Sequence, residues 1–325
     1  MISEADLKRG LNSTLHSVDF GGRLRRHHSG KVRDIFEVDG HRLLFVTSDR
    51  ISVFDRVVGT VPFKGQVLSG VSNWWMERVR DIVDHHLLAV PHANCVIARR
   101  CRPLPVEIIV RGYLTGSSPT SIWTVYARGE RTYCGHELPD HMTRHQKLPM
   151  PLVTPTTKGG AGEHDELISR GEIIRKGLVS QDLYDRVQEV ALKLYERGVE
   201  QAARRGLVLA DTKYEFGLDE DGHLVLIDEI HTPDSSRYWY AEDYERRVRE
   251  GLEPRGLDKD YVRNHMKSLG FSGNGEPPPL SDEVRMEAAR RYVALYELLT
   301  GLDFTPDFSS PEQAVLQYLS LQSAK

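Results

Sequence analysis

Two stretches of the chain alternate apolar and polar residues on either side of an Asp-Gly pair. The first covers residues 31–47, with Asp39-Gly40 at its centre, and the second covers residues 207–230, with Asp221-Gly222 at its centre. Asp-Gly between alternating segments favours a two-residue turn that joins antiparallel strands. The pattern therefore predicts one β-hairpin near the amino terminus and another in the second half of the chain.

Between the two hairpins, the apolar segment LPVEIIVR at residues 104–111 predicts a further strand. Gly112 and Gly116 follow it, and then Ser118-Pro119. Serine before proline is a common helix start, because the serine hydroxyl caps the helix and proline suits the first helical position. We therefore predict a helix that begins at Ser118 and extends to Ala127.

Later in the chain, apolar residues recur at helical spacing. This periodicity predicts helices over residues 182–205 and 282–300, and Gly301 ends the second of them. A last helix is expected after Ser310, where SPEQ has the form of a capping box. The proline-rich connector GNGEPPP at residues 273–279 is incompatible with a helix.

The order of these elements, with hairpins early and helices last, predicts an α+β protein. We expect two lobes: a sheet-rich lobe over residues 1–103 and a larger α/β lobe over residues 104–325, which ends in helices from about residue 282. A length of 325 residues agrees with two packed units. A ligand cleft between the lobes is then the default expectation.

Composition narrows the class of protein. Hydrophobic residues make up 39% of the chain and charged residues 28%, which is typical of a soluble globular protein. The net charge is −4 and the basic residues are spread along the chain, so no nucleic-acid partner is expected. The longest apolar runs are far shorter than the roughly 20 residues that span a bilayer, and the first residues lack an apolar signal segment. We therefore predict a cytoplasmic protein without a membrane partner, whose three cysteines are free thiols.

The second predicted hairpin carries acidic residues. A two-residue turn at Asp221-Gly222 would put Glu215 directly across from Asp228. Two opposed carboxylates repel each other, and a magnesium ion would turn this pair into a binding site. Lys213 points to the same face and would meet a phosphate. The alternative is an ordinary exposed face on which Lys213 neutralises its neighbours, and the spacing alone leaves both interpretations open.

Two further sets of residues suit anions. Gly30-Lys31 opens the first hairpin, where a backbone turn and a lysine would cover a triphosphate, although such a pair often only makes a turn. Arg111 and Ser117 lie at a strand end and near a predicted helix start, which suits a phosphate monoester. Capping by Ser118 with a solvated Arg111 is the simpler local interpretation. The chain contains neither G-x-x-x-x-G-K-[ST] nor G-x-G-x-x-G, so a P-loop and a Rossmann site are disfavoured.

Six segments resemble, in the same order, motifs of the phosphoribosylaminoimidazole-succinocarboxamide synthase (SAICAR synthetase) family. They are SGKVRDIFEV from Ser29, TSDRISVFD from Thr47, LPVEIIVRGYLTGSS from Leu104, TPTTKGGAGEHDELIS from Thr154, LADTKYEFG from Leu209 and IDEIHTPDSSRYW from Ile227. The third and fifth resemble the two signature motifs of the family. The resemblance covers most of residues 29–240 and leaves the terminal helices with less signal.

The resemblance implies a two-lobed fold whose sheet lobe, residues 1–103, is similar to the nucleotide lobe of protein kinases and covers ATP. It implies an ATP-dependent ligase of de novo purine biosynthesis that joins L-aspartate to carboxyaminoimidazole ribonucleotide (CAIR) and forms SAICAR, ADP and phosphate. The ribonucleotide carboxylate would first become an acyl phosphate, which the aspartate amine attacks. The implied cofactors are ATP and Mg²⁺, and the implied partners are the small molecules CAIR and L-aspartate. The oligomeric state is left open, a monomer included.

The resemblance also implies roles for individual residues. Lys31 and Lys213 would be catalytic at the ATP phosphates, and Glu215 and Asp228 would bind magnesium. The ATP-binding residues would be Gly30, Lys31, Val32, Arg33, Glu107 and Lys213. The substrate-binding residues would be Arg111, Ser117 and Arg237, which hold the 5′-phosphate, and Ser52, Asp55, Lys64, Lys158 and Asp234 in the cleft. Asp49 and Asp165 are expected in the cleft without an assigned role.

Two other functions would use part of this set. A kinase-like small-molecule phosphotransferase would keep the ATP and metal residues, but it has no need for the second phosphate site, and the chain lacks H-R-D and D-F-G. A non-enzymatic nucleotide-binding module would have no reason to combine Lys213, Glu215 and Asp228 with a second anion site. Dependence of ADP release on aspartate separates the three functions.

Overall fold

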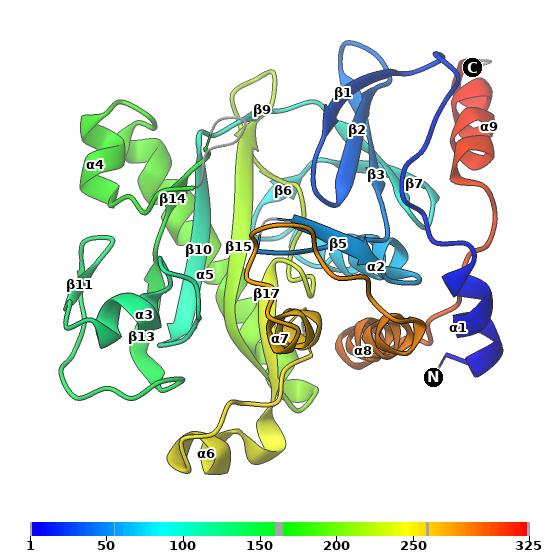
Figure 1. The fold of residues 1–325 in the computed structure, drawn as a ribbon. Helices are drawn as coiled ribbons and strands as arrows, with labels where there is room; N and C mark the ends of the chain where they lie inside the picture. The colour runs from blue at the N-terminus through cyan, green and yellow to red at the C-terminus, as the bar shows by residue number, and fades with distance from the viewer. Residues whose placement is uncertain (1, 55, 160–164, 258–259, 324–325) are drawn as a thin grey trace.

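The computed structural model describes residues 2–54, 56–159, 165–257 and 260–323, which form an α+β fold around two larger β-sheets (Figure 1). The first sheet has the antiparallel strand order β1-β2-β3-β8-β7. Its strands are β1 (Arg25–Ser29), β2 (Arg33–Glu37), β3 (Arg42–Thr47), β7 (Leu87–His92) and β8 (Cys95–Arg99).

The second sheet is built around one long strand, β15 (Leu207–Leu218). It has the order β13-β10-β15-β16-β6, with β14 also paired to β10, and β17 and β9 also paired to β15. The other strands are β6 (Asp84–His85), β9 (Arg102–Pro103), β10 (Val106–Tyr113), β13 (Lys147–Val153), β14 (Thr156–Thr157), β16 (Leu224–Ile227) and β17 (Ser236–Tyr240). Two separate strand pairs are β4 (Arg50–Val53) with β5 (Arg56–Thr60), and β11 (Thr132–Tyr133) with β12 (His136–Glu137).

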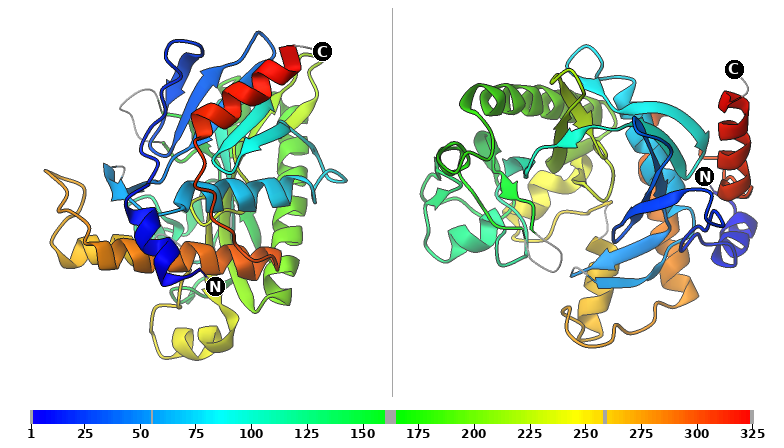
Figure 2. Two further views of the ribbon diagram at one scale, coloured as in Figure 1. Left: turned by 90° about the vertical axis from the view of Figure 1, so that its right-hand side faces the viewer. Right: turned by 90° about the horizontal axis from the view of Figure 1, so that it is seen from above.

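Helices cover one face of the second sheet and join the two sheets. Helix α5 (Gln181–Arg204) packs against β15, β10 and β13. Helices α2 (Lys64–Met76) and α8 (Asp282–Thr300) contact each other and run side by side, as the left view of Figure 2 shows. The remaining helices are α1 (Glu4–Leu11), α3 (Ile122–Ala127), α4 (Arg170–Arg175), α6 (Ala241–Arg249), α7 (Asp260–Ser268) and α9 (Pro311–Ser323). Over the described residues, no helix is both long and apolar enough to cross a membrane.

Segments from one part of the chain pair or pack with the other part in both directions. Strands β6 and β9 come from the first 103 residues but pair within the second sheet. In the other direction, α8 contacts α1 and α2, and α9 contacts β7 at the edge of the first sheet. The division into lobes at residue 103 stays a prediction, and any such boundary is crossed in both directions.

Alternation along β10 and β15 gives the second sheet one buried face and one charged face. Val110, Tyr214 and Phe216 are buried and belong to the same hydrophobic cluster as Val187 and Leu194 of α5. The residues between them point to the other side, since successive side chains of a strand alternate. These residues are Glu107, Ile109 and Arg111 on β10, and Asp211, Lys213 and Glu215 on β15. The charged face carries most of the candidate site.

Several predicted elements are confirmed. The hairpin over residues 31–47 forms β2 and β3, although residues 38–41 connect the strands in place of the expected two-residue turn. The segment 104–111 forms most of β10, and the helices predicted over 182–205 and 282–300 appear as α5 and α8. Gly301 ends α8 with φ of 72°, in the left-handed region that glycine favours.

The predicted start of the helix after β10 is wrong. Helix α3 begins at Ile122, with Ser121 as its N-cap residue. The N–H and the hydroxyl of Ser121 both donate to the carbonyl of Ser118, at 3.0 and 2.8 Å. These bonds close a turn over residues 119–120 before the helix begins. Ser117 and Ser118 therefore stay outside the helix and line a cavity.

Candidate functional site

A cavity of about 280 Å³ lies on the charged face of the second sheet. Five residues predicted from the sequence line it, namely Arg111, Ser117, Lys213, Asp234 and Arg237. They come from β10 and the segment after it, from β15, and from β17 and the segment before it. Pairing of these strands therefore gathers residues that are far apart in the sequence.

Two arginines share one carboxylate at this cavity. Asp211 of β15 lies across from Arg111 of β10 on one side and from Arg237 of β17 on the other. Its Oδ2 accepts from Nη1 of Arg111 at 3.2 Å and from Nη1 of Arg237 at 2.5 Å. Nε of Arg111 also donates to Oγ1 of Thr154 at 3.0 Å. We call Arg111, Asp211 and Arg237 the arginine cradle; its excess positive charge, beside the Ser117 hydroxyl, suits a phosphate.

A second group of charged side chains follows on the same face of β15. Nζ of Lys213 donates to Oε1 of Glu107 at 2.8 Å and to Oε1 of Glu215 at 2.7 Å. Oε2 of Glu215 accepts from Nζ of Lys158, in the segment after β14. Lys213 thus lies between Asp211 and Glu215 along the strand, and it contacts the carboxylates while it also lines the cavity.

These contacts set the protonation of the group. Burial alone would raise the pKa of Glu215, but Lys213 and Lys158 outweigh it and hold this pKa well below its usual value. For Glu107, burial raises the pKa: Lys213 opposes the rise, and the charge of Glu215 adds to it. Burial opposes the charge of Lys213, yet Glu215 and Glu107 raise its pKa well above the usual value. Near neutral pH, Lys213 and Glu215 are therefore both charged.

The predicted register of the second hairpin is wrong by one residue. Glu215 lies across from Ile227, not from Asp228. The cause is the connection between the strands, because residues 219–223 form a longer loop in place of the expected two-residue turn. The shift moves Asp228 beyond the end of β16.

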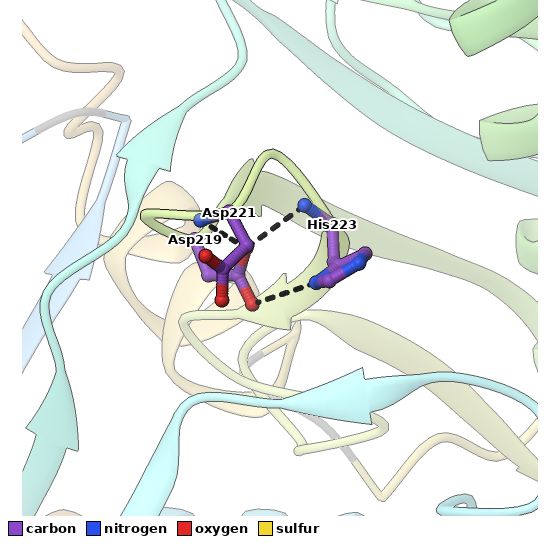
Figure 3. Close-up of side chains that lie close together, drawn as sticks. All are labelled: Asp219, Asp221 and His223. Carbon is purple, nitrogen blue, oxygen red and sulfur yellow. Dashed lines mark hydrogen bonds and ion pairs between the residues drawn. The ribbon is translucent and has the colours of Figure 1, made fainter.

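This loop brings Asp219, Asp221 and His223 together (Figure 3). One potential ligand atom of each lies within 4.8 Å of the others. The Asp219 carboxylate accepts from the N–H groups of Asp221 and His223, at 3.1 and 2.8 Å, and from Nη1 of Arg99 at 3.2 Å. Asp221 and His223 are exposed. These hydrogen bonds explain the group as a cap of the loop, so it carries no metal assignment.

Asp228 instead faces the first sheet. It has a left-handed backbone with φ of 64° and pairs with Nη1 of Arg33 on β2. Nη2 of the same guanidinium lies 2.5 Å from Oε2 of Glu229. Burial opposes the charge of Arg33, but Asp228 and Glu229 raise its pKa above the usual value. The negative charge of Asp228 also contributes to the raised pKa of Lys213.

The oxygen donors of this region fit a magnesium ion, which is typically held by one or two carboxylates together with substrate phosphates. We call the four carboxylates the acidic cluster: Glu107, Glu215, Asp228 and Glu229. Among the described residues, the cations bonded to them are Arg33, Lys158 and Lys213. The cluster therefore keeps one excess negative charge, which a bound divalent cation would balance.

Residues 30–32, which the sequence predicts to cover ATP, connect β1 to β2. Arg50 fixes this connection: its Nη2 donates to the Gly30 carbonyl at 3.1 Å and its Nε to the Lys31 carbonyl at 3.0 Å. Arg50 itself is buried beside Asp34, with Nη2 and Oδ1 3.2 Å apart. The buried Arg50 side chain thus fixes the backbone of the loop, whereas the Lys31 side chain is exposed.

The predicted cleft residues fall into different environments. Lys64 at the start of α2 is fully buried, and its Nζ lies 2.7 Å from Oδ2 of Asp234. The hydroxyl of Tyr292 on α8 donates to Oδ1 of Asp234 at 2.7 Å. Asp234, which lines the cavity, is therefore bonded to side chains of both α2 and α8. Ser52 is half-buried on β4, and Asp55 lies outside the described residues.

Asp49 is a buried carboxylate at the start of α2. It accepts from the N–H groups of Leu15 at 2.7 Å and Gly65 at 2.8 Å. A Cβ at Gly65 would lie 2.2 Å from a backbone oxygen, so this approach requires glycine. Burial raises the pKa of Asp49 to about 6. Asp165 accepts from the N–H of residue 159 at 3.0 Å and acts electrostatically on Glu107.

Three residues of the site are absent from the sequence-based prediction. Asp211 is at the centre of the arginine cradle, and the alternation with Lys213 and Glu215 is a signal that could have identified it. Glu229 follows Asp228 in a motif that the prediction includes. Arg263 lines the cavity from α7, a helix for which the sequence analysis finds no signal.

Comparisons with known proteins agree with one another. The profile of a family described as SAICAR synthetase matches residues 26–278. A phosphoribosylaminoimidazole-succinocarboxamide synthase of Legionella pneumophila is 45% identical over 297 residues, which cover 90% of this chain and 91% of that protein. A chloroplastic protein of the same name from Arabidopsis thaliana is 46% identical over 291 residues, covering 87% of this chain and 69% of that protein. The solved SAICAR synthase from Saccharomyces cerevisiae, complexed with SAICAR, has a TM-score of 0.80 at 32% identity and covers 90% of this chain and 100% of its own.

Proposed function

This chain belongs to the SAICAR synthetase family of purine-biosynthetic ligases, and from that premise we propose which substrates and residues its site uses. The substrates are ATP, CAIR and L-aspartate, and the products are SAICAR, ADP and phosphate. The observation that supports this most directly is the charged face of β15, where an anion-binding arginine cradle and an acidic cluster lie on either side of Lys213.

The chemistry requires activation of a carboxylate. A carboxylate is a poor acylating agent at neutral pH, so its oxygen first takes the γ-phosphoryl group of ATP, and ADP leaves. The aspartate amine then attacks the carbonyl carbon, forms the C–N bond and expels phosphate, while the amine nitrogen loses a proton. Both steps depend on positioning and on neutralisation of phosphate charge.

The arginine cradle and Ser117 hold the 5′-phosphate of CAIR in this proposal. Two guanidinium groups and a hydroxyl match the oxygens of a phosphate monoester. Asp211 fixes both guanidiniums before the ligand binds, so little ordering remains to be done on binding. From Asp211 to Glu215, β15 advances roughly 13 Å, which separates the ribonucleotide phosphate from the site of phosphoryl transfer.

Lys213, Lys31 and the acidic cluster serve ATP. Glu215 and Asp228 would hold Mg²⁺, which neutralises charge on the β- and γ-phosphates when it is bound. Lys213 directs its ammonium toward the transferring phosphoryl group, and the loop of residues 30–32 lies over the phosphates. Glu107 contributes to ATP binding beside Lys213.

A coupled assay of ADP release, with each substrate omitted in turn, tests this function. We expect product formation to require ATP, CAIR and L-aspartate together, and chromatography to identify SAICAR. Full ADP release with CAIR but without aspartate would indicate a phosphotransferase instead. Binding of ATP without any turnover would indicate a nucleotide-binding module.

Two further expectations from the sequence belong to the same proposal. One is that the protein acts in the cytoplasm. The other is that a sheet-rich lobe, residues 1–103, covers ATP against the remainder of the chain. Fractionation of cells that express the tagged full chain tests the first, and protection of residues 29–37 from hydrogen exchange by ATP tests the second.

A further inference from the structure

Arg33 ties the two sheets together at the acidic cluster. It lies at the first position of β2, and its guanidinium reaches Asp228 and Glu229, which follow the last residue of β16 in the other sheet. The side chains of the three residues are 16, 22 and 11% exposed. This fork is therefore a largely buried contact between segments far apart in the sequence.

The two carboxylates in the fork are held differently. Glu229 also accepts from Oγ1 of Thr232 at 2.6 Å, so it keeps a partner if Arg33 moves. For the Asp228 carboxylate, the contacts of the described residues give Nη1 of Arg33 as the side-chain partner. Nη2 of Arg33 thus holds Glu229, which Thr232 also anchors. Nη1 neutralises Asp228, for which Arg33 is the side-chain partner among the described residues.

A small cavity lies next to this pair, and Asp228 is the carboxylate in its lining. A cavity of about 20 Å³ is lined by Arg33, Asp228 and His86, among others. A cavity of roughly 10 to 15 Å³ by the same measure already holds a water molecule. Asp228 acts electrostatically on Lys213, which also donates to Glu215, so the charge at Asp228 is coupled to the Glu215 side of the cluster.

A guanidinium and a divalent cation compete for the negative charge of Asp228 when both lie at close range. Like charges a few ångströms apart in a partly buried site repel each other strongly, and the double charge of the metal doubles the effect. We propose that Arg33 is a positioning residue that occupies the place of the metal at Asp228: it neutralises this carboxylate in the metal-free protein and retreats to Glu229 when the cation binds. This inference rests on the proposed role of Asp228 as a magnesium ligand.

The proposal makes Arg33 a competitor of the metal. Titration of the full chain with Mn²⁺ alone, followed through the spectrum of the free ion by electron paramagnetic resonance, measures the competition without nucleotide or turnover. Arg33→Met should bind Mn²⁺ at least about fivefold more tightly than wild type, because no cation has to leave Asp228. Arg25→Met is the matched control, since Arg25 pairs with Glu37 on the same sheet, and it should leave the affinity unchanged. Equal affinity in wild type and Arg33→Met would overturn the proposal.

Thermal unfolding gives a second readout. In EDTA, Arg33→Met should melt below wild type, because Asp228 and Glu229 lose their shared cation. With saturating Mn²⁺ this difference should shrink, since the metal takes over Asp228 and binding stabilises the folded state. The same melting difference in both conditions would show that Arg33 stays on Asp228 and would refute the exchange. If Arg33→Met does not fold, Arg33→Lys keeps a charge but cannot hold both carboxylates, and a partial rise in affinity is then the expected result.

Asp228→Asn separates this inference from the proposed function. If Asp228→Asn leaves Mn²⁺ affinity unchanged, Asp228 is not a ligand and both proposals fail at that residue. If it weakens Mn²⁺ binding while Arg33→Met matches wild type, the metal assignment stands and the role of Arg33 alone is wrong. Aspartate-dependent ADP release reports on the ligase activity independently of both results.

Discussion

The arginine cradle and the acidic cluster use one strand in opposite ways. In the arginine cradle, two guanidiniums from β10 and β17 share the carboxylate of Asp211, so these three residues together carry a formal charge of +1. In the acidic cluster, four carboxylates face three cations of the described part of the chain, so these seven residues together carry a formal charge of −1. The arginine cradle and the Glu215 side of the acidic cluster follow from side chains that alternate along β15 and meet partners on neighbouring strands, whereas Asp228 and Glu229 join the cluster from beyond the end of β16.

This difference shows how a single strand can present an anion site and a cation site. The arginine cradle and the acidic cluster form the two ends of the charged face of β15. The excess charge at each end is small, because fixed counter-ions neutralise most of the charged side chains there. These side chains can therefore be partly buried without a ligand. A phosphate at one end and a divalent cation at the other would then complete the neutralisation. Ligand binding at each end is therefore expected to depend on the counter-ions as much as on the residues that touch the ligand.

Lys213 belongs to both ends, so its removal should have the largest effect. Lys213→Met leaves Glu107 and Glu215 without their shared cation and removes a positive charge from the cavity. We expect kcat/KM to fall roughly hundredfold to thousandfold, as when one preorganised charge donor is lost from an active site. The free energy of unfolding should fall by about 2 kcal/mol or more, because buried carboxylates lose their partner. Steady-state ADP release and urea unfolding measure the two effects, and Lys213→Arg should restore stability more than turnover. Near-normal activity in Lys213→Met would remove this residue from the catalytic group.

Glu215→Gln tests the role of the acidic cluster in metal binding without changing the arginine cradle. It should raise the Mg²⁺ concentration for half-maximal activity at least about tenfold and lower turnover, because one proposed ligand loses its charge. Affinity for the ribonucleotide should remain, since the arginine cradle is untouched. Magnesium titrations of activity, paired with calorimetry of ribonucleotide binding, compare the two ends. Asp221→Asn, in the exposed loop, is the control. An unchanged magnesium requirement in both Glu215→Gln and Asp228→Asn would show that the metal assignment is wrong.

How much of this site the sequence predicts depends on whether the signal is local. An apolar run predicts β10, and the alternation of a strand predicts the shared face of Lys213 and Glu215; both are present in the structure. The position of Asp228 relative to Glu215 depends on loop length, and the loop of residues 219–223 differs from the expected turn because Asp219 stabilises it by hydrogen bonds. The contact of Arg33 with Asp228 joins two sheets and has no local signal.

The missed helices have physical explanations too. Helix α2 is buried along nearly its whole length, including Lys64 and Gln66, so it shows no polar stripe from which a helical period could be recognised. Its first residues also depend on Asp49 and on the close approach at Gly65, which are tertiary contacts. The prediction for the fold class succeeds because it needs only the order of elements, whereas the positions of such helices need the packed structure.

Asp49 differs from the carboxylates of the arginine cradle and the acidic cluster. Among the described residues, backbone N–H groups hold its buried carboxylate in place of a paired cation. Burial raises its pKa in the folded protein to about 6, above the value of about 3.9 in an unfolded chain. The folded state therefore binds the proton more tightly, so the stability contributed by this group is fully present below pH 4 and is lost as the pH rises through 6. Between these pH values, the free energy of unfolding of wild type should fall by about 1 to 3 kcal/mol relative to Asp49→Asn, which cannot titrate there. Urea unfolding of both proteins at several pH values measures this difference, and parallel pH profiles would contradict it.

The arginine cradle should give the smallest effects, because lysine preserves its charge. Arg237→Lys and Arg111→Lys keep a cation beside Asp211 but lose the bidentate geometry that suits a phosphate. We expect each change to weaken binding of the ribonucleotide about tenfold, or about 1.4 kcal/mol, which is the scale of one charge-assisted hydrogen bond. Affinity for ATP with Mg²⁺ should change less than about twofold, since the acidic cluster lies farther along β15 and keeps its own counter-ions. Isothermal titration with a 5′-phosphorylated ribonucleotide and with ATP separates these outcomes. Thr154→Val is a useful intermediate, because it removes the bond from Nε of Arg111, together with the bond from its own hydroxyl to the Ile109 carbonyl, and keeps both arginines. It should weaken ribonucleotide binding less than Arg111→Lys. Unaltered ribonucleotide affinity in both arginine variants would show that the two ends of β15 do not divide their ligands in this way.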